Sequence, residues 1–208
     1  AGFSIVTFTG GAAGYTVAHG LSQAPEIVFT FNRTDSAGAN YVFTTAVDGT
    51  IDYFSLDATT AKNNDPFSMP AFTSTVFSLD NDYGMDAGDN CVAYCFHSVD
   101  GYSKIGTYEG NGNNDGTFVY TGFRPAFLLV KSVDSTSDWL LVDDKRIGYN
   151  PENEYIEVNN ANAEGTVNMF DLVSNGFKNR DRTADPNIAE TYLYIAFASQ
   201  PFKFANAR

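Results

Sequence analysis

The carboxylates of residues 80–89 are the first side chains whose spacing suggests chemistry. The segment reads DNDYGMDAGD, and Asp80, Asp82 and Asp86 bring together the hard oxygen ligands that Ca²⁺ prefers. The Glu that ends an EF-hand loop is absent, and Asp, Asn and Gly in this density are also ordinary turn formers. The sequence therefore leaves two interpretations open: a calcium site, which a net charge of −13 would favour, and a plain turn.

A second group of carboxylates surrounds the run KRIGYNPENEY. Asp143, Asp144, Glu152 and Glu154 could supply the two carboxyl groups of a glycoside hydrolase, which need a defined separation and one raised pKa. The alternative is that residues 143–146 form a solvated turn whose ion pairs contribute under about 1 kcal/mol each. No Ser, Cys or His spacing suggests a nucleophile. We predict that the chain is not an enzyme.

Two loops, 111–115 and 148–155, are the predicted contact surface for a ligand. Tyrosines could stack on a sugar or protein surface, while Asn and Glu side chains form hydrogen bonds. Loops held by rigid strands commonly carry such sites, although the same loops could simply make turns or contact a neighbouring subunit. The predicted ligand-binding residues are Tyr149, Asn150, Glu152, Asn153 and Tyr155.

The composition limits the class of protein that must position these residues. Twelve Lys and Arg face 25 Asp and Glu, so a nucleic-acid backbone would be repelled. No apolar run approaches the ~20 residues of a membrane span, and the first residues do not resemble a signal peptide. With 18 Gly, 12 Tyr and 18 Phe among 208 residues, the composition favours aromatic sheets joined by turns. We expect an all-β protein that binds no nucleic acid and does not insert into membranes.

The cysteines and histidines are interpreted as structural. Cys91 and Cys95 lie in a strand-like run, which places them on one face about 13 Å apart, too far for a disulfide. Free Cys is among the most often buried residue types. Neither His19 nor His97 has a partner at metal-ligand spacing.

The two halves of the chain resemble each other, which is the most informative feature of the sequence. Thr7-Phe8-Thr9-Gly10 matches Thr107-Tyr108-Glu109-Gly110, an offset of 100 positions. Further matches pair Val17 with Val119, Pro25 with Pro125, Phe77 with Phe177, and Phe96 with Phe197. The gaps fall in Gly- and Asn-rich loops, so we interpret the pattern as a tandem duplication.

Each half offers about seven short strand-like runs separated by turn residues, as in a sandwich or barrel. In the second half they are IGTYE, TFVYTG, AFLLVKSV, WLLVDD, YIEVN, GFKN and TYLYIAFAS. We therefore expect two tandem homologous antiparallel β-sandwich modules, jelly-roll-like, over residues 1–101 and 102–208. They could stand side by side or merge into one larger sandwich. Apolar runs predict burial of Phe96, Phe127, Leu129, Leu193, Ile195, Phe197 and Trp139.

Several runs together carry a family resemblance: GYSK, TGFRPAF, KRIGYNP, SNGFK and the final PFKFANAR. The chain resembles a C-terminal tandem-repeat domain of unknown function from virion-associated proteins of tailed, mainly marine, bacteriophages. The first half departs from the pattern by lacking the SNGF turn.

The resemblance implies a non-enzymatic structural or adhesive protein at the virion surface, on a fibre, tail or capsid. The resemblance also implies three interactions: assembly into a homotrimer, contacts with other virion proteins and binding to a host cell-surface glycan. Two alternatives remain: a tailspike-type depolymerase that degrades glycans, and a capsid decoration protein that binds no receptor. Parallel β-helix repeats, the usual carrier of tailspike hydrolases, are missing, which favours display over cleavage.

Overall fold

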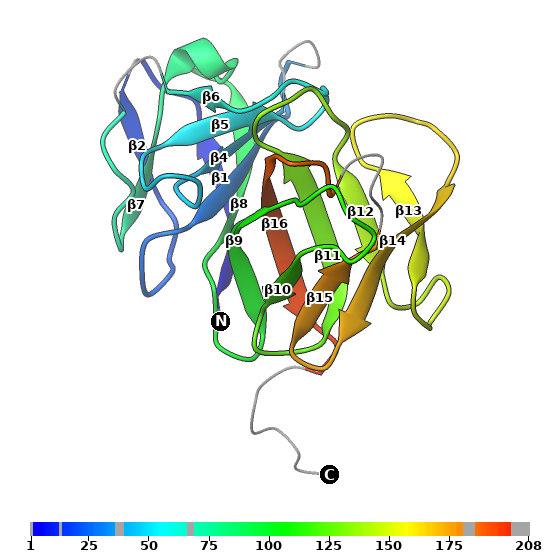
Figure 1. Ribbon diagram of the computed structural model, residues 1–208. Coiled ribbons are helices and arrows are strands. Elements are labelled where there is room, and N and C mark those ends of the chain that lie inside the picture. Colours follow the sequence, from blue (N-terminus) through cyan, green and yellow to red (C-terminus); the bar gives the residue numbers. More distant parts are fainter. Residues whose placement is uncertain (1, 13, 36–39, 66–68, 181–185, 201–208) are drawn as a thin grey trace. The chain divides into compact units, whose positions relative to one another are not determined.

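The computed structural model describes residues 2–12, 14–35, 40–65, 69–180 and 186–200 (Figure 1). The chain forms two compact units. The first comprises Ala1–Asp57 and Lys62–His97, and the second comprises Ala58–Ala61 and Ser98–Arg208. Apart from one 3₁₀ turn, the regular structure of the described residues is entirely β, and every strand pair is antiparallel. The all-β prediction is confirmed.

The first unit consists of a six-stranded and a two-stranded sheet. The larger sheet has the order β1 (Phe3–Thr9), β8 (Asn90–Phe96), β3 (Ile27–Asn32), β4 (Tyr41–Thr44), β5 (Asp52–Ser55), β6 (Asn63–Asn64). The smaller sheet pairs β2 (Tyr15–Ala18) with β7 (Val76–Leu79), and the 3₁₀ turn η1 covers Asn81–Tyr83.

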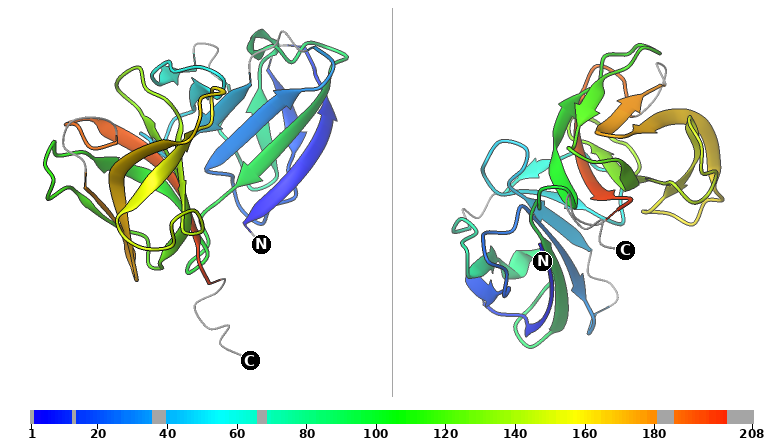
Figure 2. Two further views of the ribbon diagram at one scale, coloured as in Figure 1. Left: turned by 90° about the vertical axis from the view of Figure 1, so that its right-hand side faces the viewer. Right: turned by 90° about the horizontal axis from the view of Figure 1, so that it is seen from below.

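The second unit consists of one eight-stranded sheet, which curls into a nearly closed barrel, as the view from below in Figure 2 shows. Its order is β10 (Phe118–Tyr120), β15 (Gly176–Asn179), β14 (Gly165–Val173), β13 (Glu152–Glu157), β12 (Leu140–Asp143), β11 (Pro125–Ser132), β16 (Thr191–Ala198), β9 (Ser103–Glu109). Seven of these strands coincide with the predicted runs. The strand β14, GTVNMFDLV, was not predicted.

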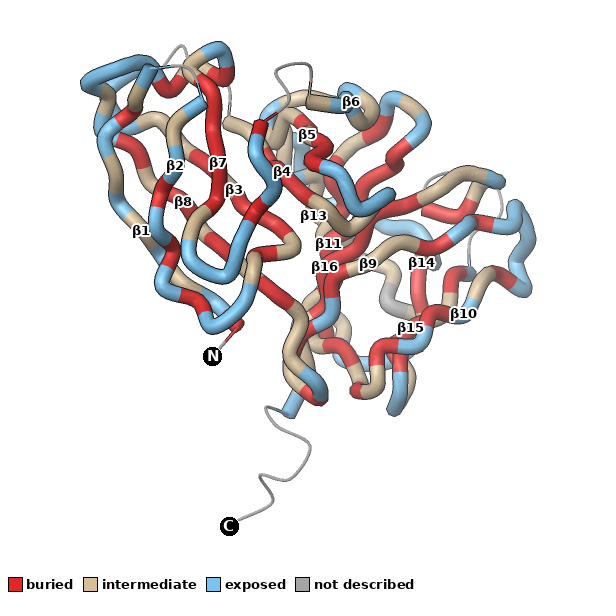
Figure 3. Tube along the Cα trace, turned by 90° about the vertical axis from the view of Figure 1, so that its left-hand side faces the viewer, coloured by how far each residue is buried: buried red, intermediate tan, exposed pale blue. Residues whose placement is uncertain are grey.

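Period-two burial explains why these residues form strands. Along β1 exposed and half-buried residues alternate without interruption (Figure 3), so one face of the strand packs inward through Val6 and Phe8. The side chains that pack around Phe77 form the core of the first unit, and those around Phe177 form the core of the second.

The predicted core residues divide into two groups. Leu129, Leu193, Ile195 and Trp139 are buried, as expected. Three phenylalanines near strand ends, Phe96, Phe127 and Phe197, were predicted to be largely buried and are of intermediate burial. Phe127 and Phe197 are cross-strand partners whose rings meet edge to face at 5.6 Å, so they shield each other.

Strand registers place the aligned residues of the two halves at equivalent positions. Val17 pairs with Phe77, and Val119 pairs with Phe177. The partner of Phe96 on β3 is Ile27, while the partner of Phe197 on β11 is Phe127, at the position aligned with Ile27. The interpretation of this correspondence as a duplication remains a prediction.

Both cysteines are free and buried on one face of β8, within the first core, as predicted. Burial raises the pKa of Cys95 to about 12. Within the described parts of the chain, no helix has the length and apolar character of a membrane span.

Candidate functional site

The two predicted contact loops meet at a polar hollow of about 250 Å³ in the second unit. Its lining comes from both loops, through Asn114 and Pro151, from the strand β14 and from the residue that follows β15. The lining residues are Asn114, Pro151, Asn168, Asp171 and Arg180. An adjoining hollow of about 280 Å³ shares three of them and adds Val167.

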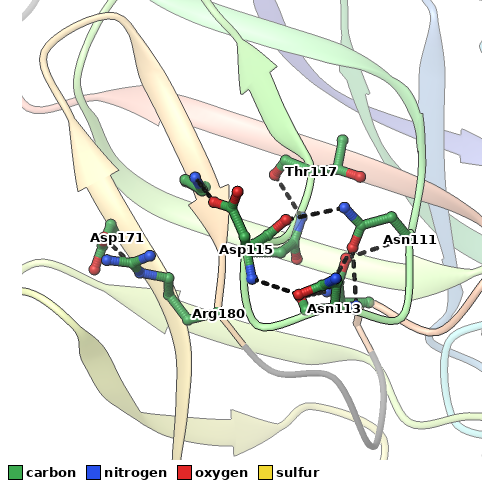
Figure 4. A network of polar contacts seen from close by, with 9 residues as sticks. Asn111, Asn113, Asp115, Thr117, Asp171 and Arg180 are labelled. Atoms are coloured by element: carbon green, nitrogen blue, oxygen red, sulfur yellow. Dashed lines mark hydrogen bonds and ion pairs between the residues drawn. The ribbon is translucent and has the colours of Figure 1, made fainter.

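Successive asparagine turns fix the shape of the loop 111–115 (Figure 4). The backbone N–H of Asn113 donates to Asn111 Oδ1 at 3.0 Å, and that of Asp115 donates to Asn113 Oδ1 at 3.0 Å. The buried Asn187 donates to the carbonyl of Asn113 at 2.8 Å and accepts from the N–H of Asn111. The loop is therefore held by a buried amide, and Asn114 is presented at its exposed tip.

The charges around the hollow are balanced. Arg180 Nε donates to Asp171 Oδ2 at 2.7 Å (Figure 4). Lys178 forms an ion pair with Asp115. The hydrogen bond from Lys178, with the positive charges of Lys178 and Arg180, holds the pKa of Asp115 below its usual value. The hollow thus combines asparagine amides with ion-paired charged groups. Hydrogen-bond donors and acceptors lie side by side in it, which suits a ligand rich in hydroxyl groups.

The other predicted ligand residues do not form one exposed platform. Tyr149 is 67% exposed, but Asn150 is bound to the backbone of Leu172 through both ends of its amide, at 3.0 and 2.9 Å. Asn153 is half-buried with its Oδ1 enclosed, and the side chain of Glu152 lies outside the described residues. The sequence could not show that Asn150 is engaged within the fold.

Tyr155 lies against the second core and faces a separate hollow of about 250 Å³. Its cross-strand partner is Gly165, and a Cβ on that glycine would lie 2.2 Å from the ring. Burial raises the pKa of Tyr155, and the neighbouring carboxylates of Glu157 and Asp138 add to this. The ring therefore packs across a glycine and is not free on both faces for stacking.

The acidic segment 80–89 behaves as a turn. Asp80 is buried and caps η1, with Oδ1 accepting from the N–H of Asp82 at 3.2 Å and Oδ2 from that of Gly14 at 3.0 Å. Asp82 and Asp86 are exposed. Among the residues that the structure describes, no group of three or more His, Cys, Asp or Glu is placed to hold a metal ion. The calcium interpretation remains a prediction.

A family model described as "Domain of unknown function (DUF7483)" matches residues 1–201. The chain belongs to the DUF7483 family. The match spans both units, so this family comprises the pair of units and not one of them. A comparison with curated proteins and a comparison with solved structures each found no match.

Two of the four carboxylates considered for hydrolysis in this DUF7483 chain, Asp143 and Asp144, are held by basic groups. Asp143 is partly buried, yet hydrogen bonds from the N–H of Lys145 and from Arg146 lower its pKa. Asp144 is buried and forms ion pairs with Arg124 at 2.9 Å and Lys145 at 3.1 Å. A general acid at neutral pH needs a raised pKa, so Asp143 is poorly suited to that role.

The buried His19 has a structural role. Its Nδ1 accepts from the N–H of Leu21 at 3.0 Å, so its Nε2 carries the proton that it donates to the carbonyl of Thr73 at 3.0 Å. Both ring nitrogens are thereby occupied.

Proposed function

We propose that this chain is a non-enzymatic structural and adhesive protein displayed on the surface of a phage particle, on a fibre, tail or capsid. The observation that carries the adhesive part is the hollow in which Asn114 of one loop and Pro151 of the other meet. The placement on a phage particle rests on the sequence resemblance to virion-associated repeat domains.

The geometry favours binding over cleavage. Sites for weakly bound glycans need fixed hydrogen-bonding groups, and the hollow offers two exposed amides beside the Arg180–Asp171 pair. A depolymerase would need a carboxyl group kept protonated near a carboxylate. The lowered pKa of Asp143 and the two ion pairs of Asp144 work against that use of the predicted group.

Display on a particle would also compensate for weak binding at each site. A homotrimer presents three copies of the hollow, and many trimers on one particle raise the effective affinity without any new contact. Other virion proteins and a host cell-surface glycan are the proposed partners. A decoration protein that binds no receptor is the second candidate, because turns and subunit contacts could account for the same loops.

Two measurements test the proposal. Antibodies against the purified chain should label intact particles that encode it, and labelling only after disruption would contradict surface display. The purified chain should also be retained on host surface polysaccharide without releasing new reducing ends. New reducing ends would show a depolymerase, and absence of retention would favour the decoration protein.

The variant that tests the hollow in the retention experiment combines Asn114→Ala with Asn168→Ala. Both residues are exposed, and no hydrogen bond of either side chain is found within the described chain, so the fold should be unaffected. We expect at least about a tenfold loss of affinity, the size typical of removing central polar contacts. Asn160→Ala with Asn162→Ala is the control, since both amides lie on another exposed loop.

A further inference from the structure

A second hollow, of about 240 Å³, lies at the seam of the curled sheet, where the edge strands β9 and β10 approach each other. A hydrogen bond from Thr117 Oγ1 to the carbonyl of Glu109 joins the two sides of the seam at 2.6 Å. All residues that line the hollow belong to the second unit: Ser98, Asp100, Ser103, Lys104, Tyr120, Thr121 and Gly122. None of them belongs to the predicted contact loops.

Tyr120 forms an exposed aromatic wall of this hollow. Val119 points into the core, so its neighbours Phe118 and Tyr120 point outward, with 47% and 65% of their surface exposed. The cross-strand partner of Tyr120 is Gly176, which has no side chain to cover the ring. Gly122 has φ +86°, and a Cβ there would lie 3.7 Å from the Tyr120 hydroxyl. Glycines on two sides leave the ring accessible.

Lys104 places a positive charge beside this ring. Six of the described Lys and Arg residues form ion pairs with carboxylates: Lys62, Arg124, Lys145, Arg146, Lys178 and Arg180. Lys104 is exposed and is not among them, although the chain carries about two acidic residues for each basic one. Its ammonium group can therefore donate hydrogen bonds to a ligand without first breaking an ion pair.

The remaining wall is polar and rigid. Ser98 Oγ accepts from the N–H of Ile105 at 3.0 Å, and Ser103 Oγ accepts from the N–H of Val99 at 3.1 Å. The hydroxyl of Thr121 donates to the carbonyl of Phe123 at 2.6 Å. Asp100, on the turn before β9, is exposed and supplies an anionic acceptor at the rim. These backbone bonds fix the wall before a ligand arrives, which lowers the entropy cost of binding.

We propose that this hollow binds one pyranose ring of a polysaccharide. The ring stacks on Tyr120, while Lys104 donates to its hydroxyl groups and Asp100 accepts from them. The volume is below the ~300–1,000 Å³ of sites for drug-sized ligands, which limits the occupant to about one ring. Phe118, two residues along the same strand face, lies about 7 Å away and provides a platform for the next sugar.

This site is separate from the Asn114 hollow. Its test does not depend on whether the protein is displayed on a phage particle. Saturation-transfer NMR on the full chain uses five methyl glycosides as probes, those of glucose, galactose, mannose, N-acetylglucosamine and glucuronic acid. We expect at least one to receive saturation. Tyr120→Ala should weaken its binding by about tenfold or more, Lys104→Gln by about fivefold, and Tyr120→Phe by less than about twofold.

Ile5→Ala is the matched control, because Ile5 is a similarly exposed large apolar side chain, at 59%, and belongs to the first unit, outside this hollow. Saturation of none of the five glycosides would overturn the proposal. Equal binding by Tyr120→Ala and wild type would also overturn it. If Tyr149→Ala or the Asn114 and Asn168 variant loses binding while Tyr120→Ala retains it, the adhesive function stands and the sugar site at the seam is rejected.

Discussion

The two units use equivalent strands in the same order but close their sheets differently. In the first unit β6 is only two residues long, and the described residues show β2 and β7 as a separate two-stranded sheet. In the second unit the equivalent strand, β14, has nine residues and pairs with both β13 and β15. The greater length of β14 thus joins, in the second unit, strands whose equivalents in the first unit form two separate sheets. The result is a single curled sheet. The strand β14 also brings Asn168 and Asp171 to the polar hollow.

Equivalent positions can also differ in burial. Ile5 on β1 and Ile105 on β9 are aligned at the offset of 100, yet Ile5 is 59% exposed and Ile105 only 5%. β1 has no charged residue, whereas β9 carries Lys104 and Glu109. An identical side chain in an identical strand position can therefore contribute to stability in one unit and almost nothing in the other.

The largest expected effect concerns the two central phenylalanines. Phe77 and Phe177 are both fully buried, and each meets neighbouring rings edge to face. Phe77→Ala and Phe177→Ala should each lower the free energy of unfolding by about 3–5 kcal/mol. Chemical denaturation with near-UV circular dichroism measures both. If only one of the two variants is destabilised, the equivalence of the two cores fails.

The second prediction uses the two isoleucines. Ile105→Ala should cost about 2–5 kcal/mol because it leaves a cavity, while Ile5→Ala should stay within about 0.5 kcal/mol as a surface change does. The same denaturation experiment compares them, and each variant is the control for the other. Equal losses would show that the environments of β1 and β9 are alike after all.

The strands of the second unit differ in how well the sequence predicts them. Seven strands of the second unit were predictable because each is a short strand-like run bounded by turn residues, although β15, GFKN, has only one apolar side chain. The strand β14 was not, because GTVNMFDLV follows the polar run NNANAEG and pairs irregularly with β13, where the register shifts between Glu152 and Glu154.

The candidate site was predictable only in part, for a related reason. Loop composition indicated the segments 111–115 and 148–155, and both contribute to the hollow. Arg180 and Asp171 could not be assigned to it, because they are distant in sequence and reach it only through the pairing of β14 with β15. Tyr155 was expected at the surface because period two alone does not say which face of a strand is buried.

The third prediction exchanges a residue between the units. Cys95 is equivalent to Ala196, and both are fully buried beside their cores. Cys95→Ala should therefore cost no more than about 1.5 kcal/mol, the size of a small core change. Because the pKa of Cys95 is about 12, iodoacetamide at pH 8.5 should label it only after denaturation. Rapid labelling of the native chain would show that β8 opens readily.

The smallest effect is expected at the ends of β4 and β12, where the two units build the same turn with different side chains. Thr44 Oγ1 accepts from the N–H of Ala46 at 3.1 Å, and Asp143 Oδ1 accepts from the N–H of Lys145 at 2.9 Å. Only Asp143 also forms an ion pair, with Arg146 at 2.8 Å. Asp143→Thr should keep the turn and lose the ion pair, at a cost of under about 1 kcal/mol at pH 7.

The pH dependence separates the two contributions. The folded pKa of Asp143 is lowered, so its charge stabilises the protein above the unfolded pKa of about 3.9, and this stabilisation is lost as the pH falls through the folded value. Threonine does not titrate. The difference in unfolding free energy between wild type and Asp143→Thr should therefore be constant from pH 5 to 8 and shrink below about pH 4. A difference that persists at pH 2.5 would mean that the turn itself, and not the charge, distinguishes β12 from β4.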